Sequence, residues 1–467
     1  MTAARHHLTL LEAAAALAAG EVSSVELTRD LLARIERLDR TFRSFATVTP
    51  AAALASAAAA DGERARGAVR GPLHGIPLAI KDICATSDAP THVGSLALRD
   101  WSPGVDATVA ARLRAAGAVL LGKLQMTEGA FAAHHPEVAA PVNPWHSDYW
   151  TGVSSSGSGV ATAAGFCFGA IATDTGGSIR FPAHACGVTG LKPTWGRVSR
   201  AGVFPLAASL DHVGAMARSA ADAAVILAAI AGRDAADPTT LAAPVPDYLA
   251  DLDRGISGVR VGFDERGASD NVDPTVSAMV HAAADVLRRL GATIVPITLP
   301  DGTEVVRAWS LMCAVECAVA HEAIYPAKAA LYGPTLAALL DLGRSAAAAA
   351  YARGHEARLR FTGDLAAIFT AVDLVLSPAQ PIPTPPVAAL TAVGADPEAG
   401  EQMLRFTAPY DMSGSPTLSL PGGVDALGLP LGFQLVGPHL GEPTLLRVGH
   451  AYQRATDWHR LRPPLAD

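Results

Sequence analysis

Apolar residues follow a helical spacing at the start of the chain. Residues 8–18 form an alanine-rich run that ends before Gly20, and Ser23 lies three positions before Glu26 in the pattern of a helix-capping box. Leucine or isoleucine then recurs at positions 27, 31, 35 and 38, which places these side chains on one face of a helix. A third helix, also rich in alanine, is expected at residues 51–60. We interpret these N-terminal helices as scaffold.

Strand patterns alternate with helical patterns along the rest of the chain. Apolar residues alternate through residues 75–80 and end on Lys81, which predicts a strand. Two further predicted strands, at 258–263 and 292–297, flank a predicted helix at 273–290, an order typical of a parallel crossover unit. Residues 303–370 have a mainly helical pattern. An α/β fold follows from this alternation.

The sequence shows no domain boundary within this order of elements. We find no internal repeat and no convincing linker, so a single domain over residues 1–467 is expected. The pattern separates N-terminal helices at about 8–60, a core at about 70–235 and a C-terminal part at about 255–460 that completes the sheet. Half of the residues are hydrophobic and 17% are charged, so the chain can bury a large core.

The charged residues give no sign of a polyanionic partner. The net charge is −8, and lysine and arginine are scattered rather than clustered, so we expect neither nucleic acid nor an anionic membrane as a partner. No uninterrupted apolar segment reaches about 18 residues, which predicts no membrane span. The first residues lack the charged and apolar pattern of a secretory signal.

The cysteines and histidines do not form a metal-site pattern. Five cysteines, an odd number without framework spacing, predict free thiols in a reducing compartment, so we expect a cytoplasmic protein. Cys313 and Cys317 stand four residues apart on a predicted helix, but no further ligand completes a site, and we interpret them as core. The adjacent histidines at 6–7 and 134–135 are interpreted as polar loop residues. We therefore expect no metal and no cofactor.

Residues 150–193 place two Ser/Gly turns around an apolar run. The turns read G-V-S-S-S-G-S-G at 152–159 and D-T-G-G-S at 174–178. Glycine permits positive φ, so successive backbone N–H groups can converge on one point and bind an oxyanion or a phosphate. Two tight turns around a core helix would explain the pattern without a site. A phosphate loop requires a G-K-[ST] ending that neither turn has, so phosphate binding is disfavoured.

Lys81 closes its predicted strand and is therefore expected to be partly buried. Burial lowers the pKa of a lysine, and a neutral lysine can act as a general base. Activity that depends on Lys81 would then rise through neutral pH toward an optimum at roughly pH 8–9. A lysine that snorkels to the surface, or one that anchors Asp82 or another carboxylate, is the structural alternative.

Together, Lys81, Ser154 and Ser178 resemble the characteristic residues of the amidase signature hydrolases. The serine loop at 152–158 and the D-T-G-G-S-I-R run at 174–180 match the family's motifs, with separations of 178 − 154 = 24 and 154 − 81 = 73 residues that are usual for it. Further motifs match at 190–200, 206–214, 406–416 and 432–438, so the resemblance covers roughly residues 10–460. Val153 and Ser156 replace the family's usual glycines.

The resemblance implies a fold and a catalytic apparatus. The fold would be a mixed, largely parallel central sheet enclosed by helices. Ser178 would be the nucleophile, Lys81 the base, and Ser154, held in a cis peptide, the bridge between them. The oxyanion hole would consist of the backbone N–H groups at Thr175, Gly176, Gly177 and Ser178. The supporting residues would be Ser155 and Asp174, which hold the two loops together, and Arg180, which pairs with an acidic group.

The substrate is a small molecule with an amide or carbamate group if the resemblance holds. Met126 matches a site-lining position of the family, although Gln125 replaces the family's asparagine next to it. Phe181 stands where the glutamine-handling amidotransferases of the same family have glutamine, which favours a stand-alone amidase acting on small, apolar or aryl amides. Carbamates (urethanes) and esters carry the same carbonyl and are further candidates. A glutamine-hydrolysing amidotransferase component of a complex, a non-enzymatic binding module and a homodimeric assembly are left open.

Overall fold

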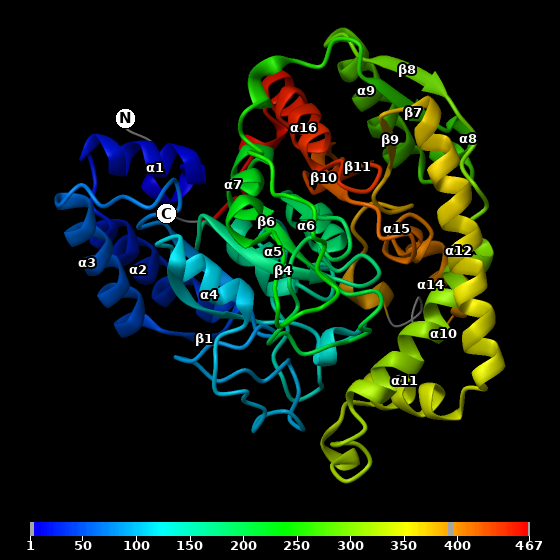
Figure 1. Ribbon diagram of the computed structural model, residues 1–467, viewed down its shortest axis with the longest axis horizontal. Helices are drawn as coiled ribbons and strands as arrows, with labels where there is room; N and C mark the ends of the chain where they lie inside the picture. The colour runs from blue at the N-terminus through cyan, green and yellow to red at the C-terminus, as the bar shows by residue number, and fades with distance from the viewer. Residues whose placement is uncertain (1–3, 391–395, 466–467) are drawn as a thin grey trace.

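The computed structural model describes residues 4–390 and 396–465. Within these residues one 11-stranded sheet runs through the whole molecule (Figure 1). The strands follow one another across the sheet in this order: β1 (Phe45–Val48), β3 (Val119–Leu124), β2 (Pro77–Lys81), β4 (Gly169–Asp174), β6 (His212–Ala217), β5 (Thr189–Lys192), β10 (Thr417–Val424), β11 (Pro430–Val436), β9 (Leu374–Pro378), β7 (Arg260–Phe263) and β8 (Thr293–Pro296).

The sheet is mixed, as expected, but parallel pairing is confined to two regions. β2 pairs in parallel with β3 and β4, and β7 pairs in parallel with β8 and β9. The other neighbours of the described sheet are antiparallel, so the expectation of a largely parallel sheet holds only locally. The centre is antiparallel because β10 returns directly into β11 through a short turn, whereas a parallel pair needs a crossover.

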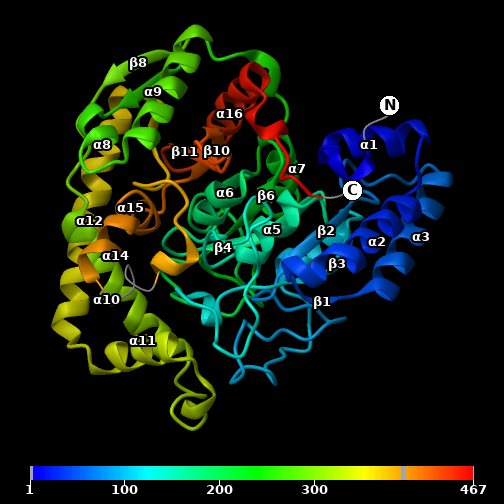
Figure 2. The same ribbon diagram turned by 180° about the vertical axis from the view of Figure 1, so that it is seen from behind.

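The expected crossover unit and the N-terminal helices are confirmed. β7, α9 (Pro274–Arg289) and β8 form the predicted strand–helix–strand unit. Helix α1 (Leu10–Ala19) and helix α2 (Ser24–Phe42) both begin with a capping box, the second of them at Ser23 and Glu26, and α3 (Pro50–Ala65) follows. Helices α2 and α3 pack at the β1–β3–β2 end of the sheet, and α1 contacts α7 (Figure 2).

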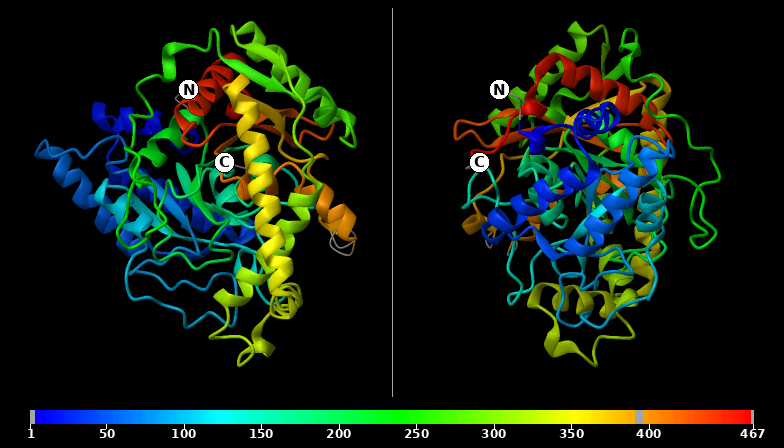
Figure 3. Two further views of the ribbon diagram at one scale, coloured as in Figure 1. Left: turned by 45° about the vertical axis from the view of Figure 1, so that its right-hand side comes forward. Right: turned by 90° about the vertical axis from the view of Figure 1, so that its left-hand side faces the viewer.

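The remaining helices enclose the sheet. Helix α5 (Ser156–Ala163) packs on β4, and α6 (Arg180–Cys186) packs on β5, β10 and β11. The others are α4 (Thr108–Ala115), α7 (Ala220–Ile230), α8 (Glu265–Ser269), α10 (Thr303–Ala320), α11 (Pro334–Ser345), α12 (Ala348–Ala371), α14 (Pro397–Leu404), α15 (Ala408–Met412) and α16 (Glu442–Thr456). Six short 3-10 helices are described, at Arg5–His7, Glu128–Ala130, Leu252–Arg254, Ala329–Leu331, Val387–Ala389 and Trp458–Arg460. The long α12 lies along the outside of the molecule, and α10 lies between it and the sheet (Figures 1 and 3).

The cysteines lie in the core of the protein. Cys313 and Cys317 are fully buried on α10, which confirms their interpretation as core residues, and the other three cysteines are also buried and free. In residues 4–390 and 396–465, no group of three or more potential metal ligands is close enough to hold an ion. No helix in this part of the chain has the length and apolar character needed to cross a membrane.

Candidate active site

The sheet brings the three predicted catalytic residues to one edge. Lys81 is the last residue of β2, and β4 runs parallel beside it and ends at Asp174. Ser178 lies in the turn that follows β4, before α6, and Ser154 lies just before α5, which packs against β4. Because parallel neighbouring strands end at the same edge, residues that are 73 and 24 positions apart in the sequence meet in space.

Lys81 is completely buried, and among the residues that the structure describes it is bonded to hydroxyl groups alone. Its Nζ donates to Ser154 Oγ at 2.8 Å and to Thr173 Oγ1 at 2.7 Å. Burial lowers its pKa from 10.5 to about 7. Within the described residues Lys81 forms no ion pair, because the adjacent Asp82 pairs with Lys123 at 3.1 Å. The interpretation of Lys81 as an anchor for Asp82 is therefore wrong, and the surface-lysine alternative fails with it.

Ser155 joins the two Ser/Gly turns, as the resemblance implies. Its N–H donates to the Ser178 carbonyl at 3.3 Å, and its hydroxyl donates to the Thr173 carbonyl at 3.1 Å. The two serine turns are thus brought together by their backbones. Within the described residues no hydrogen bond joins Ser154 Oγ to Ser178 Oγ. The Val153–Ser154 peptide bond is cis, also as implied.

One of the two serine-loop departures, at position 156, is accommodated by a neighbouring histidine. Ser156, which stands where the family has glycine, is buried at the start of α5, and its Oγ lies 3.2 Å from His134 Nε2. His134 itself is half-buried in the loop after β3, and desolvation of its ring lowers its pKa to about 4. His134 is thus a polar loop residue, as interpreted from the sequence, and its neutral imidazole lies beside the Ser156 hydroxyl.

The resemblance implies that Asp174 joins the two loops, but its hydrogen bonds lie within its own turn and to Arg180. Its carboxylate accepts the N–H groups of Gly177 at 2.6 Å and Ile179 at 2.9 Å, so it caps its own turn. Arg180 donates to both oxygens of Asp174, at 3.0 and 2.9 Å, and also pairs with Asp411 of α15. Burial opposes ionisation of Asp174, but Arg180 overcomes it and holds the Asp174 pKa well below its usual value. The expected pairing of Arg180 with an acidic group is confirmed.

Asp174 also decides which N–H groups of the turn remain available. Gly177 donates to Asp174, so its inclusion in the oxyanion hole is wrong for this structure. Within the described residues no hydrogen bond uses the N–H of Gly176 or Ser178. Ser178 is only partly buried, whereas the turn residues beside it are buried. A carbonyl that approaches Ser178 therefore meets two free donors that alternate along the turn.

Close packing explains the two glycines before Ser178. A Cβ at Gly176 would lie 2.3 Å from Cζ2 of Trp309, and a Cβ at Gly177 would lie 2.5 Å from Cε2 of Phe181. Gly177 also has φ +131°, a conformation that L side chains rarely adopt. Both positions are thus closed to larger residues by neighbours from α10 and α6.

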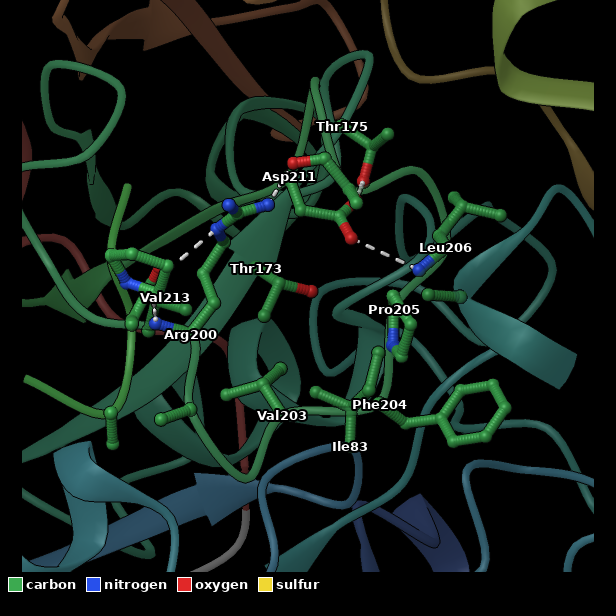
Figure 4. Close-up of a pocket in the computed structure, with 16 residues that line it drawn as sticks. Ile83, Thr173, Thr175, Arg200, Val203, Phe204, Pro205, Leu206, Asp211 and Val213 are labelled. Atoms are coloured by element: carbon green, nitrogen blue, oxygen red, sulfur yellow. Dashed lines mark hydrogen bonds and ion pairs between the residues drawn. The ribbon is translucent and has the colours of Figure 1, made fainter. Parts of the chain in front are cut away.

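A cavity of about 240 Å³ opens beside the turn (Figure 4). Thr173 and Thr175 line it together with apolar side chains from Ile83, Val203, Phe204, Pro205, Leu206 and Val213. Asp211 also faces this cavity and accepts a hydrogen bond from Thr175 Oγ1 at 2.6 Å, and burial raises its pKa to about 6. Thr173 therefore connects the cavity to Lys81, to which it is bonded directly.

The two proposed substrate-binding residues do not line this cavity. Met126 is fully buried. Phe181 is 5% exposed and packs against Trp150, with ring centroids 5.7 Å apart. Sequence reasoning also missed Thr173, Trp309 and Asp411. Thr173 directly precedes the matched run at 174–180 and Asp411 lies within the matched motif at 406–416, whereas Trp309 lies outside the matched motifs and carries no local signal.

Comparison with known proteins finds a matching family model and several relatives of similar sequence and structure. The family model described as Amidase matches residues 26–446. The chain is 49% identical over 459 residues to the "Putative amidase AmiD" of Mycobacterium tuberculosis, which covers 98% of this chain and 96% of that protein. It is 40% identical over 485 residues to one chain of the glutamyl-tRNA(Gln) amidotransferase of Chloroflexus aurantiacus, covering 98% and 99%. The solved peptide amidase from Stenotrophomonas maltophilia has a TM-score of 0.83, 34% identity and 98% coverage of both chains.

Proposed function

The chain belongs to the amidase family, and from that premise we propose that it is a serine hydrolase that cleaves the C–N bond of small amides through an acyl-enzyme on Ser178. The observation that carries this proposal is the bond from Lys81 Nζ to Ser154 Oγ at 2.8 Å, made by a lysine without an ion-pair partner in the described chain. With a pKa of about 7, Lys81 is neutral in a large share of molecules at neutral pH and can accept a proton.

The proton moves along the two serines to the base. Lys81 takes the Ser154 proton as Ser154 takes that of Ser178, and Ser178 Oγ attacks the amide carbonyl carbon. The N–H groups of Gly176 and Ser178 stabilise the oxyanion. Ser154 then returns a proton to the leaving nitrogen as the C–N bond breaks. Water attacks the ester on Ser178 and releases the carboxylic acid and the free serine.

The cavity is lined by Thr173 and Thr175 but by none of Lys81, Ser154 and Ser178, and we propose that it takes the small, apolar part of the substrate. Its volume of about 240 Å³ lies below the roughly 300–1,000 Å³ of pockets for drug-sized ligands, and its walls are mainly apolar. Small aryl amides fit this description, and carbamates and esters with the same groups would undergo the same attack. We propose these as the substrate classes.

A hydrolysis screen across anilides, carbamates, aryl esters, fatty amides and glutamine tests the proposal. We expect release of amine from small anilides by the wild type and no release by Ser178→Ala, whose melting temperature should stay close to that of the wild type. A phosphonyl fluoride should label Ser178 in the wild type alone. Wild-type rates in Ser178→Ala would contradict the assignment of the nucleophile.

The amidotransferase relatives supply the second candidate. The chain is 40% identical to a glutamyl-tRNA(Gln) amidotransferase chain over 98% of its length, so glutamine hydrolysis in a complex is a specific alternative. Phe181, which stands where the amidotransferases of the family have glutamine, favours the stand-alone enzyme. Turnover of glutamine in the screen, without turnover of anilides, would favour the alternative. A binding module without catalysis receives no support from the relatives.

A further inference from the structure

Two carbonyl groups of the nucleophile turn accept hydrogen bonds from the C-terminal half of the chain. Trp309 of α10 donates its indole Nε1–H to the Thr175 carbonyl at 2.6 Å. Thr407, which precedes α15, donates its hydroxyl to the Gly176 carbonyl at 2.7 Å. These donors lie 134 and 231 residues away in the sequence. The turn that carries Ser178 is therefore held by residues that the matched D-T-G-G-S motif does not contain.

Each of these bonds also fixes the direction of an N–H group. In a trans peptide unit the C=O and the N–H point in opposite directions. The Thr175–Gly176 unit is trans, so the bond from Trp309 to its carbonyl turns the Gly176 N–H away from the indole. The next peptide unit, Gly176–Gly177, is held at both ends, because the Gly176 carbonyl accepts from Thr407 and the Gly177 N–H donates to Asp174 at 2.6 Å. Of the two backbone N–H groups at Gly176 and Gly177, only that of Gly176 is left free.

The indole of Trp309 is placed for this role by close packing. It is 7% exposed and lies directly against Gly176, where an added Cβ would approach Cζ2 to 2.3 Å. The indole nitrogen is a donor only, and the Thr175 carbonyl is its acceptor. A phenyl ring could fill much of the same space but could not hold the carbonyl.

We propose that Trp309 is a positioning residue that holds the Thr175–Gly176 peptide so that the Gly176 N–H faces the oxyanion formed on Ser178. The inference rests on the proposed function, because it requires acyl transfer to Ser178. Trp309 touches no reacting atom and acts through the peptide plane. Loss of one complete oxyanion donor costs about 100- to 1,000-fold in kcat, so a donor that is present but misdirected should cost less, about 10- to 100-fold.

The test compares the wild type with Trp309→Phe and with a variant carrying 3-benzothienylalanine at position 309. The second variant replaces the N–H with sulfur and keeps the shape of the indole, so it addresses the hydrogen bond without a change in packing. Trp458→Phe, which alters a tryptophan of the C-terminal 3-10 helix, is the control for tryptophan replacement. The measurements are acylation of Ser178 by p-nitrophenyl acetate, the affinity of phenylboronic acid, and the melting temperature.

Both variants should acylate about 10- to 100-fold more slowly and bind phenylboronic acid correspondingly more weakly, because its tetrahedral adduct uses the same donor. KM and the melting temperature should change little, a separation that a loss of packing would not produce. If the benzothienyl variant acylates at the wild-type rate, the positioning role is refuted. A wild type that forms no acyl-enzyme refutes the proposed function instead, so the two failures are distinguishable.

Discussion

The protonation of Lys81 sets the expected pH dependence of the enzyme. Its pKa falls from 10.5 to about 7 because the amine is completely buried among hydroxyl groups. A fall of this size corresponds to a free energy on the order of 5 kcal/mol. At pH 7 it raises the neutral fraction of the amine from roughly one in 3,000 to about one half. The rate should therefore gain about a thousandfold from burial of this one group.

The assay is the pH dependence of kcat/KM for an uncharged anilide between pH 5 and pH 9.5. The rate should rise about tenfold per pH unit at low pH, bend near pH 7 and level off above about pH 8, which is slightly below the optimum expected from the sequence. Lys81→Arg should be inactive at every pH, because a guanidinium stays protonated throughout this range. An active arginine variant, or a profile that still rises at pH 9, would refute the general-base role.

A second buried lysine provides the matched control for this profile. Burial lowers the pKa of Lys192 to about 8, but its Nζ donates to the Ser415 carbonyl at 2.6 Å and to neither catalytic serine. Lys192→Met should therefore keep the bend near pH 7 that belongs to Lys81. If Lys192→Met folds normally but loses the bend near pH 7, the titration belongs to Lys192 rather than to Lys81.

Two further predictions concern the stability of the site. The fold lowers the pKa of Lys81, so the positive charge on this amine destabilises the folded protein. This destabilisation is fully present below about pH 7 and is absent above about pH 10.5, where the amine is neutral in both the folded and the unfolded protein. Lys81→Met should therefore raise the melting temperature more at pH 6 than at pH 9. Arg180 holds the pKa of Asp174 well below its usual value, so this carboxylate is ionised and paired at neutral pH. Asp174→Asn should therefore cost about 3–5 kcal/mol of unfolding free energy together with the activity. A melting temperature of Asp174→Asn equal to that of the wild type would contradict this assignment of charge.

Local patterns were sufficient to predict the parts of the site that lie within one motif. Lys81 closes an apolar strand, and Ser154 and Ser178 lie in turns rich in serine and glycine, so their chemistry can be read from neighbouring residues. The crossover unit at β7–α9–β8 was also predictable, because each of its elements carries its own period and caps. Pairing between distant strands was not, since β5 and β10 meet across more than two hundred residues.

The direction of each backbone N–H is what sequence patterns cannot supply. The motif suggested four donors in a row, yet an extended or turning chain points successive peptide units in different directions. Asp174 accepts from Gly177 and Ile179, whereas no hydrogen bond of the described residues uses the N–H of Gly176 or Ser178. The aspartate thus removes Gly177 from the donors that the motif suggested. Its role could be recognised only once both the turn and the carboxylate were placed in space.

The same aspartate explains why the site needs both halves of the chain. Asp174 is buried and ionised, so it requires the charge of Arg180, and Arg180 in turn donates to the Thr407 carbonyl at 2.9 Å and pairs with Asp411. These partners come from the segment around α15, which directly precedes β10, the strand that pairs with β5. A catalytic turn encoded in about thirty residues therefore takes its working geometry from contacts made more than two hundred residues later.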